Sequence, residues 1–242
     1  MADEKPEKEM TFLDHLDELR GAIVKSLYGI IAGTAISFIF VDFFVDKVLL
    51  LPAKIAHFNL QNLKPFGQLM MYFQVALVGG LILSLPVIVY QLWSFIAPAL
   101  HQNEKRNIKW IAFFTTLCFL VGTAFGYFLM LPLTLKFAAG FGSATIANNF
   151  ALDEYISIIL SIILAAGLVF ELPVLSFFFT KIGIINHKLM RKYWRHSIVA
   201  IMILSAVLSP GTDPLSQLLL AIPLVFLYEI SIFVSKIAKR KS

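Results

Sequence analysis

Glu171 is the chemically most conspicuous residue of this sequence, because it stands inside the apolar stretch Gly-Leu-Val-Phe-Glu-Leu-Pro-Val. An ionised carboxylate inside a bilayer costs at least ~2.5 kcal/mol, so such a residue faces a polar cavity or partner, or binds a proton. We therefore expect Glu171 to have a function. The alternative is a structural carboxyl that is hydrogen-bonded to a neighbouring helix.

A second group of acidic side chains lies in parts of the chain that are otherwise basic. The segment Thr11–Arg20 has apolar residues at helical spacing, among them Leu16, which predicts an amphipathic helix on the membrane surface before the first span. Helices of this kind are normally rich in lysine and arginine, yet Glu18 and its neighbours are acidic. Glu104, in His-Gln-Asn-Glu-Lys-Arg, taken alone is a solvated loop residue beside two bases.

Other residues that could do chemistry give no indication of catalysis. The five histidines and the single cysteine, Cys118, show no metal-ligand spacing, and the sequence has no hydrolase, Walker or dinucleotide-binding motif. We therefore expect neither an enzyme nor a bound metal or cofactor. Ser216 and Gln217 place polar groups early in the last apolar helix, where capping and solvation are the simple explanation.

Membrane-spanning helices are the elements that must position these residues. Of the 242 residues, 59% are hydrophobic and only 14% are charged, which is typical of a chain that lies in a bilayer. Residues 1–20 are charged throughout, so the first apolar run is expected to serve as an uncleaved anchor. The net charge of +5 comes from short loops beside the spans and does not indicate nucleic-acid binding.

Six segments are apolar enough to cross a bilayer, which takes about 20 residues of helix. They are Ala22–Val41, Leu69–Ile96, Ile111–Leu131, Tyr155–Thr180, His196–Leu208 and Leu215–Val234. The predicted fold class is an all-α integral membrane protein, a single domain over 1–242 with a six-helix bundle at 22–234. An amphipathic segment at 1–21 and a tail at 235–242 flank the bundle, and the fifth and sixth helices are expected to be short.

The distribution of basic residues predicts the orientation of the helices. All but four of the 20 lysines and arginines fall at the two termini or in loops on the same side as the termini. The positive-inside rule then places both termini in the cytoplasm. The outer connection at 42–68 is long enough to form a cap, and Pro86 and Pro173 favour kinks in the second and fourth spans.

Four longer motifs resemble those of one known family. They are His-Leu-Asp-Glu-Leu-Arg at 15–20, the run from Ser84 to Arg106, Phe-Glu-Leu-Pro-Val at 170–174 and Ser-Gln-Leu-Leu-Leu-Ala-Ile-Pro at 216–223. They resemble TatC, the multispanning subunit of the twin-arginine protein translocase. The resemblance implies a concave bundle in the cytoplasmic (inner) membrane of a bacterium. It also implies a receptor that binds twin-arginine signal peptides and exports folded proteins by means of the proton-motive force.

The same resemblance implies roles for particular residues. Glu18 and Glu104 match the two acidic positions that bind the arginine pair, and a carboxylate binds a guanidinium through paired hydrogen bonds that lysine reproduces poorly. The signal-peptide site is further expected to contain Leu16, Arg20, Phe95, Lys105 and Arg106. Glu171, Ser216 and Gln217 match positions that contact single-span partners of the TatA and TatB types, and Pro52 matches a proline of the first outer loop. Pro52, Pro86 and Pro173 are expected to have structural roles. Several copies of the chain are expected in a larger complex.

Two functions of other classes remain open at the level of the sequence. A proton-coupled secondary transporter would use Glu171 as its ion site and carry a small solute without partners, although the spans contain few polar residues that could converge on one site. A passive scaffold for single-span helices would bind its partners whether or not a signal peptide is present.

Overall fold

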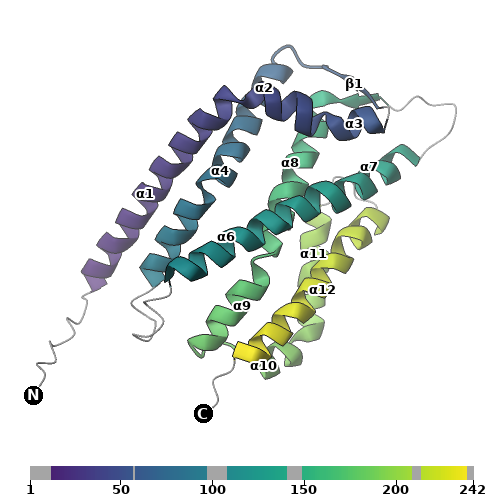
Figure 1. Ribbon diagram of the computed structural model, residues 1–242. Coiled ribbons are helices and arrows are strands. Elements are labelled where there is room, and N and C mark those ends of the chain that lie inside the picture. Colours follow the sequence, from purple (N-terminus) through teal and green to yellow (C-terminus); the bar gives the residue numbers. More distant parts are fainter. Residues whose placement is uncertain (1–11, 57, 97–107, 141–148, 209–213, 239–242) are drawn as a thin grey trace, which may run out of the picture.

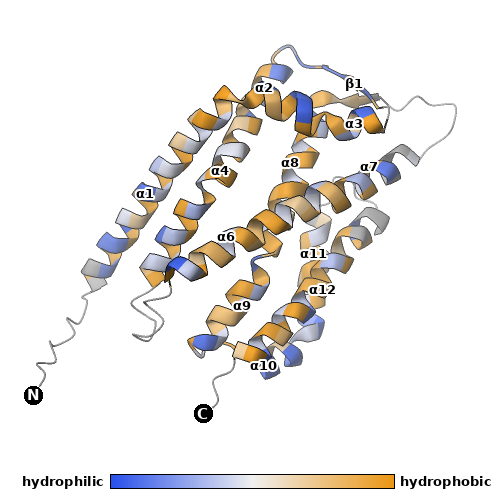
Figure 2. Cartoon of the chain, viewed as in Figure 1, coloured by the Kyte–Doolittle hydropathy of each residue, from blue (hydrophilic) through white to orange (hydrophobic). Residues whose placement is uncertain are grey.

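Apolar helices form a bundle that is closed at one end by a small cap (Figure 1). This computed structural model describes residues 12–56, 58–96, 108–140, 149–208 and 214–238. Hydrophobic residues dominate the long helices, and polar residues gather toward the two ends of the bundle (Figure 2). The first helix begins, and the last helix ends, at the end of the molecule opposite the cap. Five helices are long and apolar enough to span a membrane and a sixth is shorter, which confirms the predicted six spans.

The first two spans pack through glycines and small polar residues. α1 runs from Phe12 to Ile39 and α4 runs from Gly67 to Ile96. A Cβ atom on Gly80 would lie 2.4 Å from the backbone of Thr34, and one on Gly33 would lie 2.5 Å from the carbonyl oxygen of Gly80. The two backbones therefore touch, as is common where small residues line the interface between membrane helices.

The connection between α1 and α4 forms the cap that its length predicts. It contains α2 (Val41–Phe43), the π-helical segment η1 (Phe44–Leu49), α3 (Leu51–Ile55) and the strand β1 (Asn59–Gln61). β1 pairs in parallel with β2 (Asn149–Ala151), a contact that the sequence did not predict. Tyrosine hydroxyls from the spans donate hydrogen bonds to the cap, from Tyr127 to the Val48 carbonyl at 2.7 Å and from Tyr155 to the Leu49 carbonyl at 3.0 Å.

The third span is longer than predicted. α6 (Ile108–Phe125), the π-helical segment η3 (Gly126–Met130) and α7 (Leu131–Gly140) form one helical rod, which is strongly tilted in Figure 1. The predicted end at Leu131 is therefore wrong. The π-helical turns precede Pro132 and change the hydrogen-bond register there, so the missing N–H of this proline does not end the helix.

The fourth span is interrupted in its lower half. α8 (Leu152–Val169) and α9 (Leu172–Lys181) are separated by a turn at Phe170 and Glu171. Pro173 lies in the first turn of α9 and cannot donate a hydrogen bond to the carbonyl four residues earlier, which explains the interruption. Pro52 likewise lies in the first turn of α3, whereas α4 continues through Pro86.

The last part of the chain consists of α10 (His187–Lys192), α11 (Trp194–Leu208) and α12 (Pro214–Ala238). α11 has 15 residues, about 22 Å of helix, and is short as predicted. The prediction of a short sixth span is wrong, because α12 has 25 residues and remains helical to Ala238, beyond the predicted start of the tail.

Two serines near the end of α12, Ser231 and Ser235, are buried against α9. Ser176 donates a hydrogen bond to the carbonyl of Ser231 at 2.8 Å, and the hydroxyls of Thr180 and Ser235 lie 2.7 Å apart. These bonds satisfy the polar side chains inside the bundle, so α12 can continue without a break.

Candidate functional site

A groove lies between the first turns of α1 and the last turns of α4, and it contains the first candidate site. Its volume is about 420 Å³. Asp17, Glu18 and Lys25 contribute ionisable groups from α1, and Gln91 and Ser94 contribute polar groups from α4. The groove also passes Gly21, where an added Cβ atom would meet nothing within 4 Å. Its walls are therefore polar and open, and they carry two carboxylates on adjacent positions of one helix.

His15 and Phe95 hold the two helices together at this groove. Their rings are stacked, with centroids 4.4 Å apart and an angle of 14° between the planes. One turn further along α1, a carboxylate oxygen of Glu18 lies 3.7 Å from His15 Nδ1, and the Glu18 side chain is 42% exposed. The stacking therefore fixes the position of Glu18 beside α4 and leaves its carboxylate accessible to a cationic group.

The structure places only part of the predicted signal-peptide site in this groove. Glu18 and Phe95 line it, whereas Leu16 and Arg20 are exposed on α1 and are not among the residues that line it. The remaining predicted residues, Glu104, Lys105 and Arg106, lie outside the described residues. Whether the two predicted carboxylates converge therefore stays a prediction.

The sequence analysis missed His15, which stacks on Phe95 beside the groove, and several residues that line it, namely Asp17, Lys25, Gln91 and Ser94. A signal for them was present, because Asp17, Gly21 and Lys25 recur at helical spacing and so share a face of α1. That signal could not identify α4 as the neighbouring helix.

The predicted surface helix at the start of the chain is continuous with the first span, and its position on the membrane surface stays a prediction. From Phe12 onward this segment is part of α1, which has 28 residues and is about 42 Å long. That length exceeds the ~30 Å hydrocarbon layer, so the first turns extend the span beyond it instead of forming a separate element. Gly21 lies close to the predicted start of the span, but a single glycine costs a helix only about 1 kcal/mol and α1 continues through it.

Glu171, the second candidate site, lies in the turn between α8 and α9. The residue is 9% exposed, and neither carboxylate oxygen has a hydrogen-bond partner among the described residues. Its backbone is satisfied, since its N–H donates to Leu168 at 3.2 Å and its carbonyl accepts from Leu175 at 2.9 Å. The alternative from the sequence was a structural carboxyl that is hydrogen-bonded to a neighbouring helix. The described part of the chain contains no such hydrogen bond.

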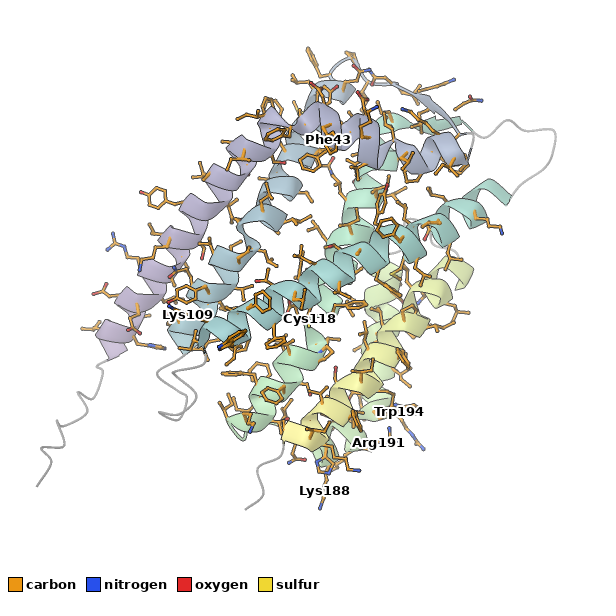
Figure 3. All side chains as sticks on the ribbon, viewed as in Figure 1. Phe43, Lys109, Cys118, Lys188, Arg191 and Trp194 are labelled. Atoms are coloured by element: carbon orange, nitrogen blue, oxygen red, sulfur yellow. The ribbon has the colours of Figure 1, made fainter. Side chains whose placement is uncertain are left out.

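Glu229 provides a contrast within the same bundle. Arg191 Nη1 lies 2.8 Å from both of its carboxylate oxygens, and Trp194 Nε1 donates a hydrogen bond to one of them at 2.7 Å. Figure 3 shows Lys188, Arg191 and Trp194 gathered at one end of the molecule, and Phe43 of the cap at the opposite end. Glu229 is therefore paired near a basic end, whereas Glu171 is buried and unpaired.

Gln217 connects the last two helices. Its Nε2 donates a hydrogen bond to the Met202 carbonyl at 2.9 Å, and Ser205 donates to the same oxygen at 2.9 Å. Gln217 thus connects α12 to α11. Capping and solvation, the simple explanation from the sequence, did not predict this contact between helices. Ser216 belongs to the first turn of α12, and its side chain lies outside the described residues.

The fold and the site define a class of protein: a polytopic α-helical membrane protein with a polar groove at one end of its first two spans. The family model "Sec-independent protein translocase protein (TatC)" matches residues 14–223. The chain therefore belongs to the TatC family, which makes it a component of a protein translocase.

Similar proteins agree with this family over nearly their whole length. A Sec-independent protein translocase protein TatC from Carboxydothermus hydrogenoformans is 35% identical over 235 residues, which cover 97% of this chain and 96% of the relative. A TatC protein from Aquifex aeolicus is 36% identical over 236 residues, covering 96% and 97%. A crystal structure described as the twin arginine translocase receptor TatC superimposes with a TM-score of 0.84 at 36% identity, covering 93% of this chain and 100% of that one.

Proposed function

We propose that this protein is the core receptor subunit of a twin-arginine translocase. It lies in the bacterial cytoplasmic membrane with both termini in the cytoplasm, and it binds signal peptides with paired arginines. Together with single-span partners of the TatA and TatB types, it mediates the export of folded proteins, driven by the proton-motive force. Several copies of the chain act together within the complex.

The groove between α1 and α4 is the observation that carries this proposal. It presents the accessible carboxylates of Asp17 and Glu18 at the end of the molecule where Arg191 and Lys188 also lie, which the positive-inside rule assigns to the cytoplasm. Two neighbouring arginines need two acceptors. We propose Glu104, which follows α4 in the chain, as the second acceptor beside Glu18. Guanidinium groups form paired hydrogen bonds with carboxylates, which gives a reason why arginines are preferred to lysines.

The unpaired carboxyl of Glu171 supports a role in binding single-span partners. A buried carboxyl without a partner costs about 1–3 kcal/mol, and a polar side chain from a second helix would remove that cost. We place Ser216 and Gln217 at the opposite edge of the same contact, beside the short helix α11. A polar residue in an otherwise apolar partner helix would then identify this surface.

A proton-coupled transporter that uses Glu171 is not favoured. The chain matches the family of a protein translocase component, and the Glu171 carboxyl has no polar partner among the described residues that could form an ion site with it.

Binding of a signal peptide to the full-length protein in nanodiscs tests the receptor proposal. We expect Glu18→Gln to weaken a fluorescent twin-arginine peptide about tenfold or more, because a hydrogen bond to a charged group contributes roughly 1.5–3 kcal/mol. A peptide with two lysines should bind the original protein less tightly and should lose little affinity in the variant.

Glu154→Gln provides the matched control, because Glu154 is an exposed glutamate at the cap end of α8. It should bind the twin-arginine peptide as the original protein does. Equal affinity of the Glu18→Gln variant and the original protein for this peptide would refute the assignment of Glu18.

A further inference from the structure

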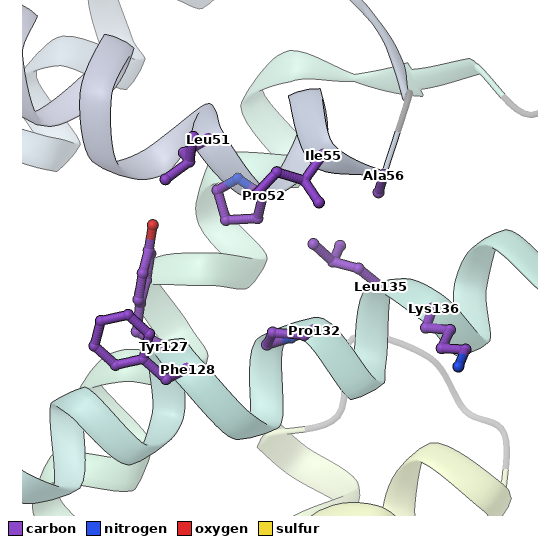
Figure 4. A pocket seen from close by; sticks show the side chains of 9 residues that line it. All are labelled: Leu51, Pro52, Ile55, Ala56, Tyr127, Phe128, Pro132, Leu135 and Lys136. Atoms are coloured by element: carbon purple, nitrogen blue, oxygen red, sulfur yellow. The ribbon is translucent and has the colours of Figure 1, made fainter.

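A second groove lies at the cap end of the molecule, between α3 and the rod formed by η3 and α7 (Figure 4). Its volume is about 420 Å³, which is within the usual range of small-molecule sites. Its walls are apolar, and they include Ile55, which is 71% exposed, and Phe128, which is 75% exposed. Tyr127 and Phe128 lie toward one end of the groove, and Lys136 lies at the other end (Figure 4).

The walls of this groove are held in place by contacts with the rest of the bundle. Tyr127 donates its hydroxyl hydrogen to the Val48 carbonyl of the cap, so the rod and the cap are tied together beside the groove. Leu135, on the α7 side, is only 6% exposed and packs into the main hydrophobic core. The groove is therefore preformed, and a ligand that enters it would not have to order its walls.

The groove extends along the rod from its end toward its middle, which is the direction in which a lipid extends from the membrane surface into the apolar layer. The rod runs without a break from Ile108 to Gly140, well beyond the ~20 residues that cross a bilayer. We place its last turns, with Lys136, at the membrane surface on the cap side. Phe128, about two turns earlier in the rod, then lies deeper, toward the apolar layer.

Lys136 is available for an anionic group. The sequence from 137 to 149 contains no acidic residue, and no ion pair of Lys136 occurs among the described residues. Lys64 differs in this respect, because it pairs with Asp153. A lysine beside an exposed apolar groove fits a phosphate group that is attached to an acyl chain.

We propose that this groove binds one anionic phospholipid from the leaflet on the cap side. The acyl chain lies along Ile55 and Phe128, and the phosphate contacts the Lys136 ammonium. This site is separate from the groove at Glu18, and it does not depend on the receptor function. The charge of Lys136 selects an anionic over a zwitterionic headgroup, and the apolar walls select a lipid over free phosphate.

Quenching of a tryptophan by brominated lipids tests the proposal. The full chain carrying Phe128→Trp is placed in nanodiscs with brominated phosphatidylglycerol or brominated phosphatidylcholine, and the signal of the protein without this substitution is subtracted. We expect phosphatidylglycerol to be preferred about fivefold, the preference that one lysine near an anionic lipid supplies, and Lys136→Gln to abolish that preference.

Lys47→Gln is the matched control, because Lys47 is an exposed lysine of the cap that does not line the groove. It should leave the preference unchanged. An equal preference in the Lys136→Gln variant would overturn the proposal. So would an absence of lipid quenching at position 128, with a photocrosslinker placed there instead capturing a second copy of the chain or a single-span partner.

Discussion

At the scale of single residues, Glu171 and Glu229 show that the same side chain can destabilise or stabilise the folded protein. Glu171 is buried with no partner among the described residues, whereas Glu229 is held by Arg191 and Trp194. Removing the first carboxyl relieves a desolvation cost, and removing the second leaves two donors without their acceptor. The two substitutions should therefore change stability in opposite directions.

We predict that Glu171→Leu stabilises the isolated protein in detergent by about 1–3 kcal/mol, while it weakens crosslinking to a single-span partner. Thermal unfolding followed by circular dichroism measures the first effect. Glu229→Leu serves as the comparison and should lower the unfolding temperature. A similar loss of stability in both variants would mean that Glu171 has a partner that stabilises it within the chain.

The ion pair between Lys64 and Asp153 is a second feature at this scale, and Lys64 lies outside the spans, between β1 and α4. The hydrogen bond to Asp153 raises the pKa of Lys64 above its ordinary value of 10.5. A raised lysine pKa contributes stability below pH 10.5 that disappears as the pH rises.

We therefore expect Asp153→Asn to be less stable than the original protein by a constant amount between about pH 5 and pH 9. The difference should vanish in base, as the pH rises through the folded-state pKa of Lys64, which lies above 10.5. Unfolding temperatures of the two proteins, measured across this pH series, check the expectation. Glu154→Gln, which affects Lys64 only through longer-range electrostatics, should show a smaller difference; a difference that persisted unchanged in base would contradict the role of the pair.

At the scale of elements, the contact between α1 and α4 depends on the absence of side chains. An added Cβ on Gly80 would meet the Thr34 backbone, which cannot move away as a flexible side chain could. We predict that Gly80→Ala separates the two helices and lowers the free energy of unfolding by about 1–3 kcal/mol, the usual cost of overpacking. The same change should weaken signal-peptide binding, because the groove needs both helices in register.

Gly21→Ala tests whether this effect comes from packing and not from helix propensity. Gly21 lies in α1 with open space around it, so the substitution should leave stability unchanged or raise it by about 0.5–1 kcal/mol. Thermal unfolding of both variants gives the comparison. A loss of stability at Gly21 as large as that at Gly80 would contradict the importance of the close contact.

The sequence was sufficient to predict elements that form because of local residue patterns. It was insufficient where contacts between distant parts of the chain determine the structure. Six apolar runs predicted six spans, and Pro173 predicted an irregularity beside Glu171 that the structure contains as a complete break. The end of α12 was misplaced because the hydrogen bonds that Ser231 and Ser235 form with α9 depend on how two helices pack. At the groove, Glu18 could be identified from its motif, whereas its contact with His15 and Phe95 depends on how two helices pack.

At the scale of the whole molecule, the chain has two chemically different ends. Lys188 and Arg191 lie at the end where α1 begins and α12 ends, and the lysines that the sequence assigned to the outer side belong to the cap or to helix ends beside it. This asymmetry is the physical basis of the proposed orientation.

We predict that a membrane-impermeant maleimide added to spheroplasts labels Asn59→Cys and does not label Lys188→Cys, both made in a Cys118→Ala background. Both positions are exposed in the structure, so accessibility from the membrane side alone should decide the result. Opening the membrane should make position 188 reactive and thereby show that its thiol is available. Labelling of Lys188→Cys in intact spheroplasts would reverse the proposed orientation.

The pairing of β1 with β2 has a consequence for how the protein is made. Asn59 and Asn149 are separated in the chain by α4 and by the rod of α6, η3 and α7, which cross the bilayer in opposite directions. The two strands can meet only after the ribosome has supplied both crossings and the insertion machinery has returned the chain to the side from which β1 emerged. The cap is therefore a late, long-range step of biogenesis, and its closure marks the point at which the first three spans have been inserted in the correct order.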